Sequence, residues 1–110
     1  PKGITTNARG EKTLDKAERK RYNKILVGVR TVDGEEVKTL YEHLYDRAAQ
    51  RKASPGQIRE ILKDPDMIYP GNKRGVANTG NRRVYQKGEY KVVFDFGTGQ
   101  IVTVVDRKEK

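Results

Sequence analysis

Residues 82–105 read RRVYQKGEYKVVFDFGTGQIVTVV, and this stretch decides the fold. Three runs within it are rich in β-branched and aromatic residues, the types that favour strands: residues 82–86, 89–96 and 100–105. The connections between the runs, Lys87-Gly88 and Gly97-Thr98-Gly99, are short and contain glycine, which suits tight hairpin turns. The stretch therefore predicts an antiparallel meander of three strands.

Side chains alternate between the two faces of a strand, so each strand assigns its residues to two sides. In the middle strand one side is predicted to carry Tyr90, Val92, Phe94 and Phe96, and the other Lys91, Val93 and Asp95. In the last strand one side is predicted to carry Val102 and Val104, and the other Ile101, Thr103 and Val105. One face of the sheet is therefore expected to be apolar and covered by helices.

Two helices are predicted before the sheet. The first covers residues 35–52, because five apolar residues fall within about 100° on a helical wheel: Val37, Leu40, Tyr41, Leu44 and Ala48. The second covers residues 54–64, where Ser54 and Gln57 match a capping box and Pro55 suits the first helical position. Helices followed by strands predict an α+β domain, with N-terminal helices packed on one face of a C-terminal antiparallel sheet.

The other segments carry weaker patterns. Residues 1–24 are polar almost throughout and are expected to be a basic linker or a weakly helical lead-in, dispensable for the core of a single domain over residues 25–110. Residues 25–30 form a short apolar run that suits a strand or a buried lead-in. Residues 70–81 are rich in turn residues and predict a long loop, and loops of this length are usually functional or disordered.

The excess positive charge lies in two blocks. The chain has 110 residues with 24 Lys and Arg against 15 Asp and Glu, a formal net charge of +9. Residues 1–24 carry eight basic and three acidic side chains, and residues 70–91 carry six and one, so each block has a net charge of +5. A basic face suits nucleic acid first and an anionic membrane surface or an acidic protein second. The alternative is that the charge serves solubility alone.

Several classes of protein do not fit the composition. No apolar run approaches the roughly 18 residues of a membrane span, and the N-terminus lacks the apolar core of a signal peptide. With no cysteine, the chain has no disulfide framework and no thiolate zinc site. The sequence contains no phosphate-binding P-loop, nucleophile elbow or cluster with metal-ligand spacing, so neither a metal nor a cofactor is expected.

Three stretches between residues 42 and 107 resemble a known family. They are EHLYDR at 42–47, SPGQIREILKDP at 54–65 and VYQKGEYKVVFDFGTGQIVTVVDR at 84–107. Together they resemble the barnase, EndoU, colicin and RelE (BECR) superfamily of ribonucleases, as in the C-terminal toxin domains of colicin D and of contact-dependent growth inhibition effectors. The resemblance implies helices on a four-stranded antiparallel sheet and metal-independent cleavage of RNA in a cleft on that sheet, with tRNA the expected target. It also implies delivery into the cytoplasm of a target cell as part of a larger effector, and neutralisation by a dedicated immunity protein.

His43 is the main candidate for acid–base chemistry, since it is the one side chain of the sequence that titrates near neutrality without perturbation. Metal-free cleavage of RNA needs a base for the 2′-hydroxyl proton and an acid for the departing 5′-oxygen. Arg47 lies one helical turn later, where it is expected to assist His43 electrostatically. In the family an inward-facing helix histidine is a frequent catalytic group. The alternative is that His43 is an ordinary boundary residue.

Three residues of the meander are candidates to act with His43. The resemblance suggests that Thr103 holds the scissile phosphate, although threonine is also a good strand former on a solvated face. Lys91 is predicted on the same face as Thr103 and is a second electrostatic helper, with Asp95 as its candidate salt-bridge partner. Tyr85 belongs to the adjacent strand, where its phenol is either a phosphate positioner or a core side chain.

Four basic residues in and beside the predicted loop are candidates for RNA binding: Lys73, Arg74, Arg82 and Arg83. Cations among glycines suit contacts with phosphate groups. The sequence therefore predicts a monomeric domain that binds and cleaves RNA, paired in its producer with an acidic immunity protein. The alternative from another class is a non-catalytic RNA-binding or ribosome-associated module, which would use the same cations without His43.

Overall fold

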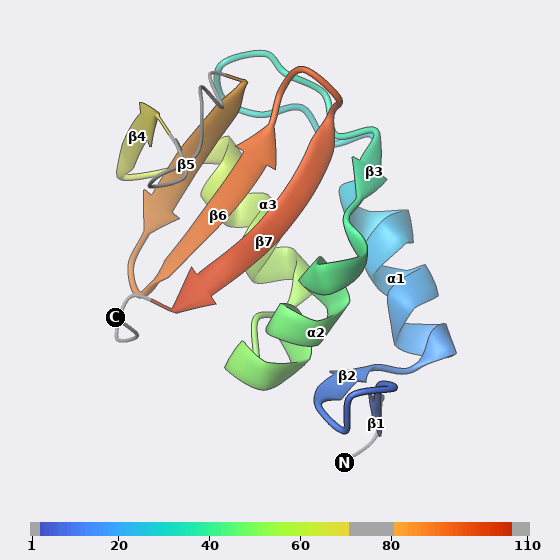
Figure 1. Ribbon diagram of the computed structural model, residues 1–110. Coiled ribbons are helices and arrows are strands. Elements are labelled where there is room, and N and C mark those ends of the chain that lie inside the picture. The colour runs from blue at the N-terminus through green and yellow to red at the C-terminus, as the bar shows by residue number, and fades with distance from the viewer. Residues whose placement is uncertain (1–2, 71–80, 107–110) are drawn as a thin grey trace.

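A five-stranded sheet forms the centre of the computed structural model, which describes residues 3–70 and 81–106 (Figure 1). The strands lie in the order β3-β7-β6-β5-β4. Three of them are β5 (Arg82–Lys87), β6 (Tyr90–Asp95) and β7 (Gln100–Asp106), and each pairs antiparallel with the next. The predicted meander is therefore confirmed.

Two short strands that the sequence patterns do not predict complete the sheet. β3 (Thr39–Leu40) lies parallel to the start of β7, and β4 (Met67–Pro70) pairs antiparallel with β5. Strands of two and four residues are too short to show a periodicity of their own. The sheet is therefore mixed, and the expectation of a purely antiparallel sheet is wrong at its β3 edge.

A bulge changes the face assignment in β7. The pairing of β6 with β7 skips Val102, which lies between the paired residues Ile101 and Thr103. Because an extra residue shifts the alternation of side chains, Ile101 and Val104 are both fully buried. The prediction that Val104 and Ile101 lie on opposite sides of the strand is therefore wrong.

Three helices accompany the sheet: α1 (Lys16–Leu26), α2 (Glu42–Arg51) and α3 (Pro55–Lys63). α3 begins as predicted, because Ser54 and Gln57 form both hydrogen bonds of the capping box. α2 is shorter than the helix predicted over residues 35–52. The first part of that prediction is wrong because Thr39 and Leu40 are extended and pair with β7.

The N-terminal segment is ordered against the rest of the domain. β1 (Ile4–Thr6) and β2 (Lys12–Leu14) form a hairpin, and α1 follows with Asp15 as its N-cap. Within residues 1–24, Leu14 and Tyr22 belong to the core, and Leu26 at the end of α1 joins them. The expectation that residues 1–24 are dispensable for the core is therefore wrong for the part of them that the structure describes. Residues 25–26 end α1, so the apolar run over 25–30 does not begin as a strand.

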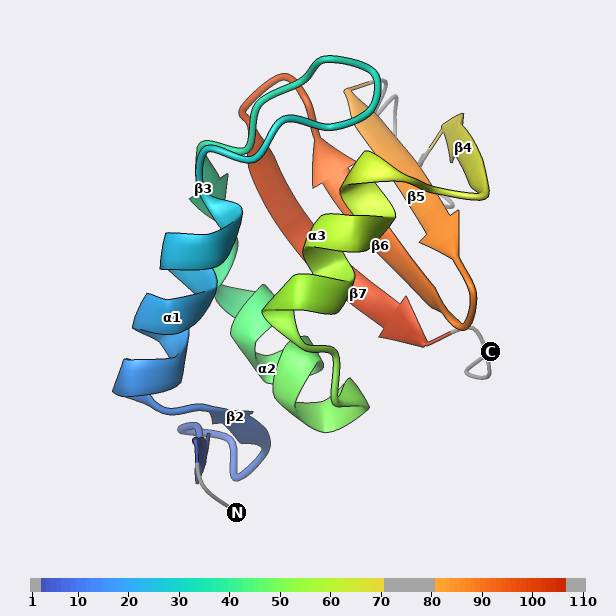
Figure 2. The same cartoon turned by 180° about the vertical axis from the view of Figure 1, so that it is seen from behind.

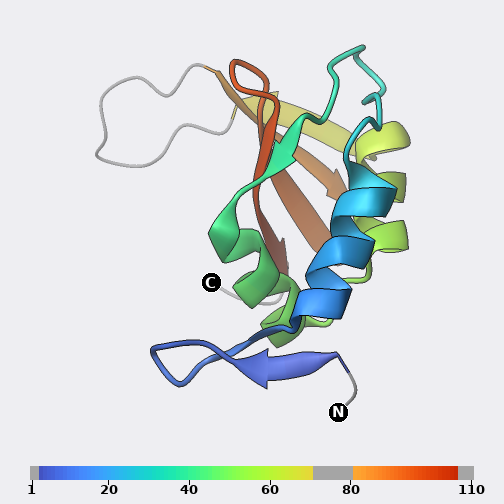
Figure 3. The ribbon, with the colours of Figure 1, turned by 90° about the vertical axis from the view of Figure 1, so that its right-hand side faces the viewer.

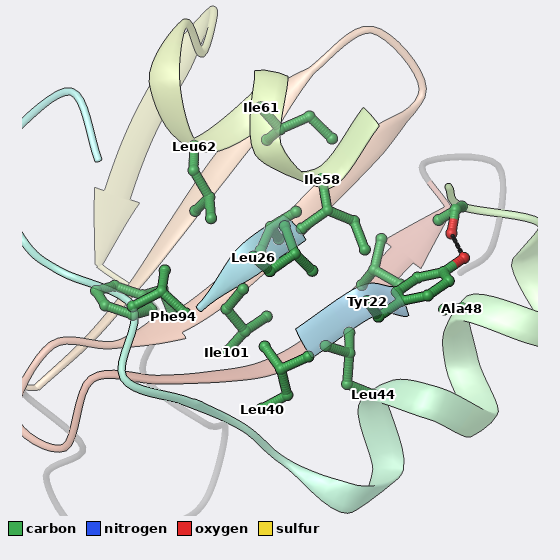
Figure 4. Close-up of a cluster of buried hydrophobic side chains, with 14 of the residues drawn as sticks. Tyr22, Leu26, Leu40, Leu44, Ala48, Ile58, Ile61, Leu62, Phe94 and Ile101 are labelled. Carbon is green, nitrogen blue, oxygen red and sulfur yellow. Dashed lines mark hydrogen bonds between the residues drawn. The ribbon is translucent and has the colours of Figure 1, made fainter. Parts of the chain in front are cut away.

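The core lies between the helices and one face of the sheet (Figures 2 and 4). Every layer contributes to it: Tyr22 and Leu26 from α1, Leu44 and Ala48 from α2, Ile58, Ile61 and Leu62 from α3, and Phe94 and Ile101 from the sheet. The Tyr22 hydroxyl donates a hydrogen bond to the carbonyl of Ala53 at 2.6 Å, which joins α1 to the connection between α2 and α3. In the part of the chain described, no helix is long and apolar enough to cross a membrane.

The two sides of the sheet differ in what covers them. Figure 3 shows the sheet from its edge, with α1 and α3 on one side. α2 begins on the other side, next to the edge of β7 (Figure 3). We call the side of the sheet away from α1 and α3 its outer face.

Candidate functional site

The outer face carries two of the predicted site residues on neighbouring strands. Lys91 on β6 lies opposite Val105 on β7, and Val93 lies opposite Thr103. Val92, which alternates with Lys91 and Val93, is fully buried beneath the helices. Since paired residues of adjacent strands point to the same side, Lys91 and Thr103 share the outer face, as predicted.

α2 runs alongside the edge of β7. At its start the backbone N–H of Tyr41 donates a hydrogen bond to the carbonyl of Ile101 at 2.9 Å. At its end Nη1 of Arg51 donates to the carbonyl of Val104 at 2.9 Å, and the Tyr90 hydroxyl donates to the carbonyl of Arg51 at 2.6 Å. The helix is thereby held against the sheet at both ends. We call this contact the α2–β7 seam.

Three basic side chains form a row along α2. His43, Arg47 and Arg51 are spaced four residues apart, which places them on one face of the helix. The end of the row reaches Thr103, because the Thr103 hydroxyl lies 3.4 Å from the same Val104 carbonyl oxygen that Arg51 contacts. The seam therefore carries a row of one histidine and two arginines along the β7 edge of the sheet, with the Thr103 hydroxyl at the Arg51 end of the row.

Arg51 is a site residue that the sequence patterns do not single out. A basic residue in the last turn of a helix already matches the helix dipole, so its charge needs no further explanation. Its spacing of four residues from Arg47 is the signal that identifies it. Arg47 itself donates a hydrogen bond to Oε1 of Gln50 at 3.0 Å.

His43 stands at the exposed start of the row. Its side chain is 43% exposed, and its Nδ1 lies 3.4 Å from Oδ2 of the buried Asp46. Nη2 of Arg9, in the loop between β1 and β2, approaches the same ring nitrogen at 3.4 Å, but Arg9 also has Glu11 as an acceptor at 3.3 Å. Since a carboxylate accepts and does not donate, we assign the Nδ1 proton to the bond with Asp46. Nε2 is then the nitrogen left to meet a substrate.

Asp46 is a carboxylate held between α2 and the N-terminal hairpin. Burial alone would raise the pKa of Asp46, but hydrogen bonds with Thr13, His43 and Asn7 outweigh burial and hold this pKa below its ordinary value. Arg9 adds an ion pair with Asp46 at 3.7 Å. Asp46 is therefore ionised at neutral pH and fixes the orientation of the imidazole, so the hairpin supports the candidate site as well as the core.

Tyr85 lies on the helix side of the sheet and is separated from the seam. It is fully buried, and its hydroxyl donates a hydrogen bond to Oδ1 of Asp33 at 2.7 Å. Burial, with the bond to Asp33, raises the pKa of Tyr85 to about 12. Of the two roles considered for Tyr85, the core side chain fits this burial and the phosphate positioner does not.

Asp33 is the centre of a polar cluster on the helix side, which we call the Asp33 cluster. Its carboxylate accepts hydrogen bonds from Thr31 and Arg83, each at 2.5 Å, as well as from Tyr85. Burial would raise the pKa of Asp33, but hydrogen bonds from Thr31 and Tyr85 outweigh burial and lower this pKa. Arg83 also lies over the ring of Phe96 at 4.1 Å. Because these groups already engage its guanidinium, the geometry does not support the predicted role of Arg83 in binding RNA.

Arg82 and Asp95 are not part of the seam. Arg82 is opposite Asp95 in the pairing of β5 with β6, while Lys73 and Arg74 fall outside the described residues. Asp95 accepts hydrogen bonds from two N–H groups of the β6–β7 turn, so turn formation accounts for this carboxylate. Within residues 3–70 and 81–106, no three His, Cys, Asp or Glu side chains are grouped as a metal site requires.

Comparisons of the chain with known protein families, characterised proteins and solved structures found no match. The functional argument therefore rests on the chemistry of the seam. An oriented imidazole can transfer a proton, guanidinium and ammonium groups can stabilise charge on a phosphate, and a hydroxyl can donate a hydrogen bond to a phosphate oxygen. Groups of these kinds are the ones that cleavage of a phosphodiester with its own nucleophile requires.

Proposed function

We propose that the chain is a metal-independent endoribonuclease toxin domain that cleaves RNA at the α2–β7 seam, with tRNA as the expected target. The observation that carries the proposal is the row along α2, which begins at the oriented imidazole of His43 and ends beside Thr103. The net charge of +9 supports a polyanionic substrate.

In the proposed reaction the ribose 2′-oxygen attacks the adjacent phosphorus, and the bond between phosphorus and the 5′-oxygen breaks. The products are a 2′,3′-cyclic phosphate and a 5′-hydroxyl, so the step needs no oxidant, reductant or second substrate. Nε2 of His43 takes the proton of the 2′-hydroxyl or gives a proton to the departing 5′-oxygen. The exposure of the ring allows this contact, and Asp46 fixes its direction.

The other candidate residues, from α2, β6 and β7, act on the charge that develops at phosphorus. Arg47, Arg51 and Lys91 stabilise the negative charge of the pentacoordinate phosphate, and Thr103 donates a hydrogen bond to one of its oxygens. Arg51 lies beside Thr103, since both contact the carbonyl oxygen of Val104.

A non-catalytic RNA-binding module is the rival function, and one observation favours the enzyme over it. Binding to phosphate alone needs cations but no oriented imidazole. In this chain a buried, ionised carboxylate stands directly behind an exposed histidine ring, an arrangement that fixes which ring nitrogen carries the proton.

Incubation of the purified chain with total RNA and with tRNA in EDTA tests the proposed function. We expect discrete fragments that end in a 2′,3′-cyclic phosphate, and no cleavage of the same RNA when its 2′-hydroxyls are methylated. Intact RNA, or fragments that require added metal, would contradict the proposal.

The charge distribution also supports a partner for such a toxin. A basic surface associates fastest with an acidic protein, so we expect a small acidic immunity protein that covers the seam and binds more slowly as salt rises. The domain would reach the cytoplasm of its target cell as part of a larger effector. Expression of the chain alone in a bacterium should stop growth, and His43→Ala should restore it. Normal growth with soluble, folded wild-type protein would argue against the toxin.

A further inference from the structure

Tyr41 is an exposed aromatic residue at the point where the chain enters α2. It is 40% exposed, one of five large hydrophobic side chains that the described residues expose to this degree. Its backbone is fixed, because its N–H donates to Ile101 and its carbonyl accepts from the N–H of Leu44 at 2.9 Å. An exposed aromatic ring on a fixed backbone can contact another molecule with little loss of conformational freedom.

The ring of Tyr41 adjoins the ring of His43. Their centroids are 5.2 Å apart and their planes make an angle of 63°, so one ring meets the other edge to face. A group that lies on the Tyr41 ring is therefore beside the imidazole that the proposed function assigns to proton transfer.

The other tyrosines have internal roles that Tyr41 lacks. Five of the six tyrosines have a hydroxyl that is hydrogen bonded inside the domain: Tyr22, Tyr45, Tyr69, Tyr85 and Tyr90. Among the described residues the Tyr41 hydroxyl has no such partner. Neither core packing nor an internal hydrogen bond therefore accounts for the placement of this ring.

From this geometry we propose that Tyr41 is a stacking subsite for an unpaired nucleobase next to the scissile phosphate. The inference rests on the proposed function and adds the substrate class: a single-stranded segment of RNA, such as a loop. A base within a duplex is already stacked on its neighbours, whereas an unpaired base can turn out and stack on an aromatic side chain. Every base has a π face, so this subsite selects for unpaired structure more than for sequence.

Binding of a 2′-O-methylated RNA oligonucleotide tests the subsite without cleavage, because the methyl group blocks the nucleophile in every variant. The oligonucleotide is offered single-stranded and as a duplex to the wild type, Tyr41→Ala and Tyr41→Phe. Met67→Ala is the control, since it removes another exposed apolar side chain, from β4 at the opposite edge of the sheet.

We expect Tyr41→Ala to weaken binding of the single strand by about 5- to 100-fold, the range that loss of one stacked base gives. Tyr41→Phe and Met67→Ala should retain wild-type affinity, and duplex binding should be the same in all four proteins. Equal affinity of Tyr41→Ala and wild type for the single strand, or equal losses on single strand and duplex, would overturn the subsite. If Tyr41→Ala weakens binding of the single strand but the wild type does not cleave unmethylated RNA, the subsite is supported and the proposed nuclease activity is contradicted.

Discussion

The Asp33 cluster and the α2–β7 seam both place polar side chains at the sheet, but they differ in how far those side chains are paired and buried. In the Asp33 cluster the carboxylate is matched by donors from Thr31, Arg83 and Tyr85, and the tyrosine is fully buried. In the seam, no carboxylate of the described residues pairs with Arg47 or Lys91, and the histidine is 43% exposed. A saturated cluster serves stability, whereas cations such as Arg47 and Lys91, which pair with no carboxylate of the described residues, are available to an anionic ligand.

The largest expected effect is the loss of stability when the Asp33 cluster is broken. Asp33→Ala leaves the buried Tyr85 hydroxyl without its acceptor and leaves Arg83 with only its longer contact to Glu35 at 3.8 Å, so the free energy of unfolding should fall by about 2–4 kcal/mol. Urea denaturation followed by circular dichroism measures this change. Glu35→Ala is the control, because its contact with Arg83 is 3.8 Å and more exposed, and it should cost less than about 1 kcal/mol. Equal stability of Asp33→Ala and wild type would make the cluster incidental.

The next effect concerns Arg51 in the seam. Arg51→Ala should lower the rate of RNA cleavage by about 10- to 100-fold, because it removes a cation beside Thr103 from the proposed phosphate site. Single-turnover rates at saturating protein measure the effect. Arg59→Ala removes the same charge from the exposed surface of α3 and should cleave at the wild-type rate. If both variants lose the same activity, Arg51 contributes net charge alone.

Alkaline pH should weaken the Asp33 cluster. The pKa of Tyr85 is raised from 10.0 to about 12 in the folded protein, so the folded state holds this proton more tightly than the unfolded chain does. The resulting stability is fully present below about pH 10 and is lost as the pH rises towards about 12. Tyr85→Phe should therefore reduce the fall in unfolding free energy between about pH 10 and about pH 12. An unchanged alkaline slope would show that the titration of Tyr85 is not coupled to folding.

The smallest expected effects distinguish the roles of two neighbouring arginines, Arg82 and Arg83. Arg82 and Arg83 point to opposite sides of β5, since successive residues of a strand alternate. Arg82→Ala should reduce the slope of RNA affinity against salt by about 0.7–1 and leave stability almost unchanged. Arg83→Ala should leave the slope unchanged and lower stability, because its charge is engaged with Asp33. A reduced slope for Arg83→Ala and not for Arg82→Ala would reverse this assignment of the two faces.

Local patterns predicted the parts of the fold that depend on neighbouring residues. The meander follows from β-branched runs joined by glycine turns, and α3 follows from the capping box of Ser54 and Gln57. The start of α2 was not predictable in this way. Leu40 fits a helical wheel, yet it is buried because it forms β3 against β7, a partner about 60 residues later in the chain.

The same limit applies to the candidate site: features set by neighbouring residues were predictable, and those set by distant residues were not. His43 and Arg47 follow from their spacing on one helix, and Lys91 and Thr103 follow from strand alternation. The separation of Tyr85 from these residues depends on Asp33, which lies 52 positions away and has no recognisable motif. The contact of Asp46 with His43 joins residues three positions apart on α2. The burial of Asp46, however, depends on the N-terminal hairpin, and the polar composition of residues 1–24 gave no indication that this hairpin forms.

The most direct test of the account is the rate at which His43→Ala cleaves RNA in EDTA, compared with wild type and with Tyr85→Phe. If the seam is the catalytic site, His43→Ala should be slower by at least about 100-fold, the usual scale of general acid–base catalysis, with its circular dichroism spectrum unchanged. Tyr85→Phe, altered on the helix side of the sheet, should cleave at the wild-type rate under conditions where it is folded. Cleavage by His43→Ala at the wild-type rate would contradict the central claim.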